Sequence, residues 1–396
     1  MLTARYLPTI GGAQVHVKNL AKEMLKRGNS VIIIAEKSPL KLKTHEYMEG
    51  VEVYRAPLRI LKGLLSPIYL FLSITICFIF NPDVIHAHFA FPPGFIGTFL
   101  SKLFKKPCIV TAHGVDILKD AETNYGIRLN PFLDFAVKFT LKSASYIIAC
   151  SEYVKNEVKK CGISEEKVIV INNGIDEIDR RVYQAEMMRQ KVRKELNLPD
   201  DSIVLFTARR LVPKNGLHYL LHAIKKVSYK IPNIMLMVAG DGPQFRELTK
   251  MVEKMNLSKN VQFLGEINNC LLERMYIACD LVIIPSVVEA FGIAALEAMA
   301  YLKPIVAFDS GGLTEIISEN KVGLIARNRD VKDLAEKILK LITSPMLKKE
   351  FTINCKRRIK KYNWDKIAEK TQNVYIWSIN QFKRRQSSHI PSIKNY

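Results

Sequence analysis

Paired cysteines are missing from this sequence. Its seven cysteines stand singly along 396 residues, and no C-x-x-C occurs. An odd number of widely spaced cysteines argues against a disulfide framework or a cysteine zinc site. The opening residues, MLTARYLPTIGG, also lack the apolar segment of a signal peptide. We therefore expect a cytoplasmic protein.

Acidic residues are scarce relative to basic ones. The chain has 59 Lys and Arg against 38 Asp and Glu, a net charge of +21. Residues 348–396 alone hold thirteen basic and three acidic side chains, most densely at 356–361. Such a balance suits nucleic acid, an anionic membrane or anionic substrates. Because no RNP-like or zinc-finger pattern occurs, we expect no nucleic-acid partner. A solvated helix face and a peripheral contact with the inner face of a membrane both stay open.

Uncharged runs long enough to span a membrane are few. One of them, Gly63 to Phe80, has 18 residues and only just reaches that length. Pro67 and two polar residues, Ser73 and Thr75, interrupt it, and a strand-like segment follows. A span here would separate strands of one predicted sheet. We predict a buried or interfacial helix, whose outer face is a candidate for membrane contact.

The most informative stretch is Leu281 to Ala300, LVIIPSVVEAFGIAALEAMA. It predicts an apolar strand, a loop containing Glu289, and a helix that starts near Gly292 and carries Glu297. Backbone N–H groups at such a helix start bind anions, and glycine allows close approach. A phosphate there, with sugar hydroxyls on the two carboxylates, describes a nucleotide-sugar. Acids near helix starts are also common without any ligand, because they complement the helix dipole.

The context E-A-F-G-x-x-x-L-E-A-M-A decides between these interpretations. It resembles the signature of the family-4 retaining glycosyltransferases, which have the GT-B fold. The resemblance implies that Glu289 contacts the donor sugar and Glu297 the nucleotide ribose. It also implies that the backbone at Phe291, Gly292 and Ile293 holds the sugar and diphosphate.

Two further segments of the first half resemble the same family. T-x-H-G-x-D at the end of a predicted strand matches the family's donor-contacting histidine, which makes His113 the second catalytic candidate beside Glu289. Asp116 is a further candidate for the ligand crevice. A Gly-Gly pair before the first helix can bring the backbone close to a ligand, although a plain turn would have the same sequence. Family members carry this pair facing the cleft, and the resemblance therefore implies a donor contact at Gly12. Only about three residues of a first strand precede that pair.

The loop after the predicted strand at 203–208 is basic. An arginine and a lysine four residues apart can hold a diphosphate, although a solvated basic loop would have the same composition. The family pattern G-R-L-x-x-x-K-G implies donor binding by Arg210. Lys214 lies one residue before the pattern's lysine position, and we assign it to donor binding as well. Asn215 occupies the family's usual lysine position.

Two other patterns are discounted. Gly240-Asp241-Gly242-Pro243 follows a strand, but Phe245 replaces the third glycine of a dinucleotide motif, so NAD binding is rejected. His86 and His88 share one side of a predicted strand, and without an evident third ligand we interpret them as structural. No D-x-D occurs, which fits transfer without a metal ion. We therefore predict no metal site and no cofactor.

The sequence predicts an α/β protein with two Rossmann-like, doubly wound parallel sheets facing a central cleft, as in GT-B. The predicted domains are 1–176 (acceptor side), 177–364 (nucleotide-sugar binding) and 365–396 (a helix returning to the first domain, with a basic tail). The expected activity is transfer from a UDP- or GDP-linked sugar to a glycan or lipid-linked acceptor. A GT-B sugar-nucleotide epimerase and a basic nucleic-acid-binding protein are the alternatives.

Overall fold

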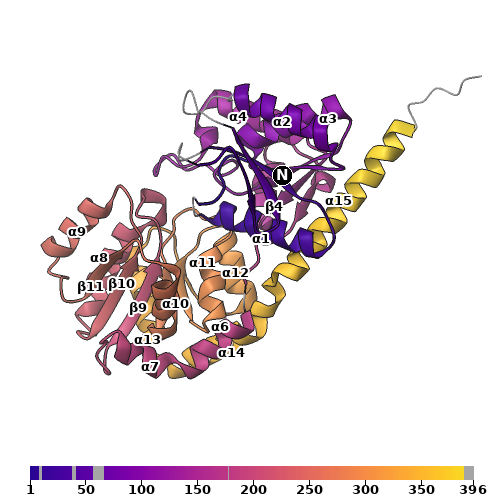
Figure 1. Cartoon of the computed structure of the whole chain (residues 1–396). Helices are drawn as coiled ribbons and strands as arrows, with labels where there is room; N and C mark the ends of the chain where they lie inside the picture. The colour runs from indigo at the N-terminus through magenta and orange to yellow at the C-terminus, as the bar shows by residue number, and fades with distance from the viewer. Residues whose placement is uncertain (9–10, 38–41, 57–66, 177, 388–396) are drawn as a thin grey trace, which may run out of the picture. The chain divides into compact units, whose positions relative to one another are not determined.

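The chain divides into two compact units. The computed structural model describes residues 1–8, 11–37, 42–56, 67–176 and 178–387 (Figure 1). Unit 1 comprises Met1–Asn173 and Trp364–Tyr396, and unit 2 comprises Gly174–Asn363. Unit 1 is therefore discontinuous in sequence, and unit 2 is a single insertion within it.

Unit 1 contains, in its described part, an eight-stranded sheet in the order β3-β4-β2-β1-β5-β6-β7-β8. Its strands are β1 (Leu2–Thr3), β2 (Ile32–Glu36), β3 (His45–Met48), β4 (Val51–Ala56), β5 (Ile85–His88), β6 (Cys108–Ala112), β7 (Tyr146–Ala149) and β8 (Val168–Val170). All neighbours pair in parallel except the antiparallel β3–β4 edge hairpin. The short first strand was predicted from the sequence, and the hairpin was not.

Helices cover both faces of this sheet. The helices are α1 (Gly12–Lys26), α2 (Pro67–Phe80), α3 (Phe95–Phe104), α4 (Pro131–Ser143), α5 (Glu152–Lys159) and α15 (Trp364–Ser387). Helices α2, α3 and α4 lie side by side on one face (Figure 1). Helix α15 packs against α1, and a buried cluster joins their apolar residues to the sheet, including Leu20, Met24, Ile109, Trp364 and Ile367.

Helix α2 confirms that the uncharged run forms a half-buried helix, while residues 63–66 lie outside the described residues. Tyr69 and Ile76 are buried against the sheet, whereas Phe71 and Phe78 are 71% and 79% exposed. Within the described ranges, no helix has both the length and the apolar character needed to cross a membrane.

Unit 2 contains, among its described residues, a six-stranded sheet that is parallel throughout. The order is β11-β10-β9-β12-β13-β14, which is the Rossmann order 3-2-1-4-5-6. The strands are β9 (Ile203–Ala208), β10 (Ile234–Ala239), β11 (Val261–Gly265), β12 (Leu281–Ile284), β13 (Ile305–Phe308) and β14 (Gly323–Ala326). The central strands β9 and β12 are buried on both faces, as continuous apolar runs predict.

The helices of unit 2 alternate with these strands after an entry pair. They are α6 (Ile178–Met187), α7 (Arg189–Glu195), α8 (Leu217–Ser228), α9 (Phe245–Lys254), α10 (Asn269–Ala278), α11 (Ile293–Ala300), α12 (Gly312–Asn320), α13 (Val331–Thr343) and α14 (Pro345–Arg358). Local capping fixes several of them: Asn268 accepts from Leu271 N–H at 2.9 Å, and Asp330 accepts from Asp333 N–H at 2.9 Å.

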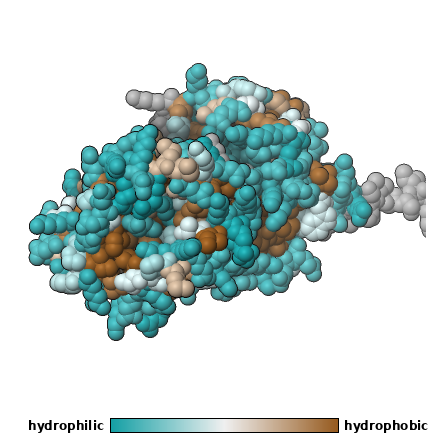
Figure 2. Space-filling view, turned by 90° about the horizontal axis from the view of Figure 1, so that it is seen from below, coloured by the Kyte–Doolittle hydropathy of each residue, from teal (hydrophilic) through white to brown (hydrophobic). Residues whose placement is uncertain are grey.

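The basic run at 356–361 lies at the end of α14 and just beyond it. Three of its lysines face carboxylates of unit 2: Lys356 bonds Glu186 at 2.6 Å, while Lys360 and Lys361 lie 3.7 and 3.6 Å from acidic partners. Three of the five basic side chains in this run are therefore paired within the unit. Hydrophilic residues cover most of the face shown in Figure 2, with apolar residues in separate patches between them.

Candidate active site

In unit 2 the candidate residues gather where the strand order reverses. Strands β9 and β12 are neighbours although β10 and β11 intervene in sequence, and ligands bind beyond the carboxyl ends of such strands. The loops that follow them are tied together, because Val287 N–H donates to the Lys214 carbonyl at 2.9 Å. Gly216 has φ +66°, and a Cβ there would lie 2.0 Å from the Pro285 carbonyl oxygen. Only glycine allows this close approach.

An ion pair joins these two loops. Arg209, the first residue after β9, places Nη2 2.5 Å from Glu289 Oε2. The two side chains are only 9% and 16% exposed. The remaining guanidinium nitrogens of Arg209, Nε and Nη1, are buried and have no hydrogen-bond partner in the described part of the chain. Buried donors without a partner are costly, so this guanidinium is prepared for an additional anionic ligand.

Lys214 contributes a second cation at this point. Burial lowers the pKa of Lys214, while the charge of Glu289 opposes that effect. Burial would raise the pKa of Glu289, but Lys214 and Arg209 together hold it below its ordinary value. Glu289 is thus a carboxylate at neutral pH, held between two cations. The cluster carries one net positive charge, which suits a ligand bearing negative charge.

The start of α11 lies in the loop after β12. Gly292 is its N-terminal boundary residue with φ +104°, and no side chain caps the helix. Within the described part of the chain, the first N–H groups of α11, at Ile293 and Ala294, therefore have no capping side chain and can bind an acceptor. A Cβ at Gly292 would lie 2.8 Å from Leu313 of α12, so the position is also confined by packing. Phe291 is buried, and its ring lies 6.3 Å from that of Tyr362.

Glu297 lies one turn further into α11. Its Oε2 accepts a hydrogen bond from the Tyr276 hydroxyl at 2.8 Å. Burial raises the pKa of Glu297, and the Tyr276 hydrogen bond and the Arg181 charge partly offset that rise. Tyr276 is itself held by a stacked Tyr301 ring at 5.4 Å. One carboxylate oxygen is thus fixed by the protein, which orients the other.

The sequence predicts diphosphate binding by Arg210, which stays a prediction, and it did not bring Arg209 into the site. The Arg210 side chain is exposed, while its carbonyl accepts from Asn215 Nδ2 at 2.7 Å. Arg209 is the residue that contacts Glu289. Motif matching could not find it, because the family pattern aligns its arginine with Arg210. The position of Arg209, immediately after a central strand, was the signal available in the sequence.

In unit 1, His113 follows β6, and its loop is held by Asp116. The Asp116 carboxylate is 1% exposed and accepts from three backbone N–H groups: Ala90 at 2.7 Å, Gly114 at 3.0 Å and His113 at 3.2 Å. Burial raises the pKa of Asp116 despite these donors. Asp116 therefore positions the His113 loop.

Two other histidines surround His113. His88 Nδ1 lies 3.1 Å from His113 Nε2, and the His16 ring centroid lies 5.1 Å from that of His113. Burial lowers the pKa of His16 to about 4 and that of His88 and His113 well below the ordinary value, so all three are neutral at physiological pH. The sequence did not bring His16 into this cluster. His86, by contrast, bonds Tyr375 at 2.6 Å and Thr111 at 2.7 Å, as expected of a structural histidine.

Gly12 is the first residue of α1 and is exposed. The preceding Gly11 has φ −179°, an extended conformation open to any residue, and no side chain among the described residues caps α1. An anion can therefore approach the first N–H groups of α1, and the donor contact at Gly12 stays a prediction.

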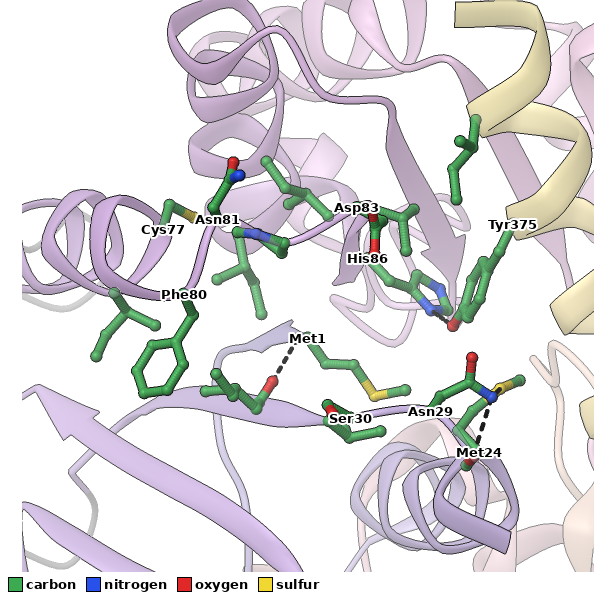
Figure 3. A pocket seen from close by; sticks show the side chains of 18 of the residues that line it. Met1, Met24, Asn29, Ser30, Cys77, Phe80, Asn81, Asp83, His86 and Tyr375 are labelled. Carbon is green, nitrogen blue, oxygen red and sulfur yellow. Dashed lines mark hydrogen bonds between the residues drawn. The ribbon is translucent and has the colours of Figure 1, made fainter. Parts of the chain in front are cut away.

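A cavity of 610 Å³ lies elsewhere in unit 1 (Figure 3). Its lining includes Ser30 and Val31, which precede β2, and Asp83, which precedes β5. His86 and Tyr375 are hydrogen-bonded to each other at its side. His113 follows the carboxyl end of β6, so this cavity does not belong to the candidate active site.

Comparisons with known proteins agree with this geometry. Residues 10–178 match the model described as Glycosyltransferase Family 4, and residues 188–358 match Glycosyl transferases group 1. An uncharacterized glycosyltransferase of Methanocaldococcus jannaschii is 31% identical over 95% of this chain and 97% of its own. This chain belongs to the family 4, group 1 glycosyltransferases. The glycosyltransferase is also 25% identical to one subunit of the human phosphatidylinositol N-acetylglucosaminyltransferase, over 95% of this chain and 75% of the relative.

Solved structures show the fold of the glycosyltransferase. Sucrose-phosphate synthase from Thermosynechococcus elongatus matches with a TM-score of 0.81 at 21% identity, over 95% of this chain and 98% of the other. Anabaena HepE, in complex with UDP-glucose, matches with a TM-score of 0.72 at 22% identity, over 98% and 99%. The fold is GT-B, with two parallel-sheet α/β domains, as the sequence predicted.

Proposed function

We propose that this glycosyltransferase uses a nucleotide-sugar donor and binds its diphosphate in unit 2. The Arg209–Glu289 pair carries this proposal, because two guanidinium nitrogens of Arg209 remain buried without a partner among the described residues. Lys214 and the uncapped start of α11 add positive potential beside them. A leaving diphosphate gains charge as the glycosidic bond breaks, and preorganised cations and N–H groups stabilise that charge most effectively.

The sugar and the ribose are assigned to the two carboxylates. Glu289 contacts the donor sugar through the oxygen not held by Arg209, and Glu297 contacts the ribose through the oxygen not held by Tyr276. Two protein cations near Glu289 support transfer without a metal ion, since they supply the charge that Mg²⁺ provides elsewhere. The family resemblance supports retention of anomeric configuration and the contact from His113. The UDP-glucose complex of HepE supports a uridine donor ahead of a guanosine one.

Donor binding is tested by thermal shift with UDP, GDP, ADP and their common sugar conjugates. A donor present at 100 times its dissociation constant stabilises the folded chain by about 2.7 kcal/mol. We expect one nucleotide family to raise Tm and Glu297→Ala to remove most of that rise. Glu336→Ala, an exposed carboxylate on α13, is the matched control. Equal shifts in both variants would contradict the site, and no shift with any nucleotide would contradict the donor class.

We also propose a lipid-linked or other surface glycan as acceptor, reached from the membrane. The human relative's name, with phosphatidylinositol in it, supports a lipid acceptor. On unit 1, exposed large apolar side chains gather on the three adjacent helices; this apolar helical face comprises Phe71, Phe78, Ile79, Phe99, Leu103, Phe132, Phe135 and Phe139. Lys102, Lys105 and Lys142 are exposed among or beside them. Aromatic rings with neighbouring lysines suit the interface of an anionic bilayer.

The membrane contact is tested by sedimentation with phosphatidylcholine vesicles, with and without phosphatidylglycerol. Phe132 and Phe135 are 71% and 68% exposed, so replacing both with serine leaves the core intact. Full burial of one phenylalanine contributes about 1.5–3 kcal/mol. The double variant should therefore bind anionic vesicles at least about tenfold more weakly. Met346→Ser, at an 84% exposed site in unit 2, should bind as the wild type does. Equal sedimentation of both variants would contradict this proposal.

A further inference from the structure

We propose that His16, His88 and His113 form a binding site for a divalent transition metal ion, with zinc the best fit. Each histidine offers one ring nitrogen, and these three nitrogens all lie within 4.8 Å of one another. They come from three separate elements: α1, the end of β5 and the loop after β6. Imidazole nitrogens are favoured ligands of Zn²⁺, Cu²⁺ and Ni²⁺.

The spacing suits tetrahedral coordination. Zn–N bonds of about 2.0–2.1 Å in a tetrahedral site place ligand nitrogens about 3.3–3.4 Å apart. His88 Nδ1 and His113 Nε2 are already 3.1 Å apart. A metal ion bound by both nitrogens would take the place of the proton between them, with the rings turned so that both lone pairs face the ion. Three histidine ligands leave a fourth position for water or another small ligand.

The protein orients one of the ligands through a second residue. His16 Nδ1 lies 2.7 Å from Asn173 Oδ1, so Nδ1 carries the hydrogen and Nε2 keeps its lone pair. Metal-binding histidines characteristically donate their other N–H in this way. The His16 ring is also packed edge-on against Trp364, with centroids 5.2 Å apart.

The surroundings favour neutral ligands and a cation. His16 and His88 are 4% and 0% exposed, and His113 is half-buried, which leaves an approach from its side. The buried Asp116 side chain lies in the same loop, where it accepts a hydrogen bond from the His113 backbone N–H at 3.2 Å.

Metal binding would have a consequence for transfer, and this step rests on the proposed role of His113. An occupied site holds the His113 lone pair on the metal and removes it from the donor sugar. The ion then acts as an inhibitor, not as a cofactor of the proposed reaction.

The test is a zinc competition against a chromophoric chelator, using the untagged full chain. Cys270, an exposed cysteine, is replaced by serine in every sample to remove a background ligand. We expect one zinc ion per chain. His16→Ala and His88→Ala should each weaken binding at least tenfold, and Asn173→Ala should weaken it about 10- to 100-fold. His222→Ala, at an exposed histidine of α8, should have no effect.

If a buried variant fails to fold, cobalt absorption and inhibition of transfer by zinc still test the proposal. Cobalt bound to the wild-type histidines should give the intense visible absorption of a tetrahedral ion. Absence of that absorption, or zinc binding by His16→Ala and His88→Ala equal to that of His222→Ala, would overturn the metal site. Zinc bound at the site without inhibition of transfer would instead overturn the role of His113, and it would leave the metal site intact.

Discussion

Arg209→Leu is expected to lower kcat about 10²- to 10³-fold, the effect of removing one preorganised donor from a developing anion. The variant removes both unpartnered guanidinium nitrogens and the partner of Glu289. The kcat of Arg209→Lys should lie between those of the wild type and Arg209→Leu, because lysine restores the positive charge but lacks the planar guanidinium group. Glu289→Gln, which keeps the side-chain size and removes the charge, should also lower turnover.

Arg246→Ala is the matched control for this experiment. Its side chain is exposed on α9 of the same unit, and we expect kcat within about twofold of the wild type, as for most surface substitutions. Kinetics with saturating donor and circular dichroism on each variant separate catalysis from folding. A loss in Arg246→Ala equal to that in Arg209→Leu would contradict the role proposed for Arg209.

Asp116→Ala is expected to destabilise unit 1 by about 3–5 kcal/mol. The carboxylate accepts from three backbone N–H groups, and each buried donor left without an acceptor costs about 1–3 kcal/mol. Both tryptophans of the chain, Trp364 and Trp377, lie on α15. Tryptophan fluorescence during urea unfolding therefore reports on unit 1.

Asp83→Ala provides the comparison, because Asp83 is an exposed acid of the same unit. Its unfolding midpoint should stay close to that of the wild type. Asp116→Ala should also reduce transfer at temperatures where the variant remains folded, since the His113 loop loses its anchor. A fluorescence midpoint unchanged by Asp116→Ala would show that the loop is held by other contacts.

The sheets were predictable because their strands are short apolar runs that alternate with helices. The runs at 261–265 and 281–285 became β11 and β12 with almost the same limits. The β3–β4 hairpin was missed because its edge position leaves alternate side chains exposed, with Tyr47 71% exposed, so the segment lacks a continuous apolar run.

The candidate site was predictable where one short segment contains the whole pattern. Glu289, Gly292 and Glu297 lie within nine residues, and backbone geometry alone relates them. The contacts of Arg209 with Glu289 and of His16 with His88 span 80 and 72 residues, and neither has a local signal. Such pairs depend on strand order, which no local pattern determines. The Tyr276 hydrogen bond to Glu297 was hidden for the same reason.

The insertion of unit 2 within unit 1 has a consequence for synthesis on the ribosome. Ile175 N–H donates to the Tyr362 carbonyl at 2.8 Å, and Ile175 and Asn363 form a parallel bridge, so the two ends of unit 2 lie together. Unit 2 is complete as soon as its own residues have emerged, and domains generally fold as units during translation. Unit 1 begins first but must wait for α15, whose Trp364 and Ile367 cover Leu20 and Met24. The half of the protein made first is therefore finished last, and its apolar surface is open to chaperones throughout that interval.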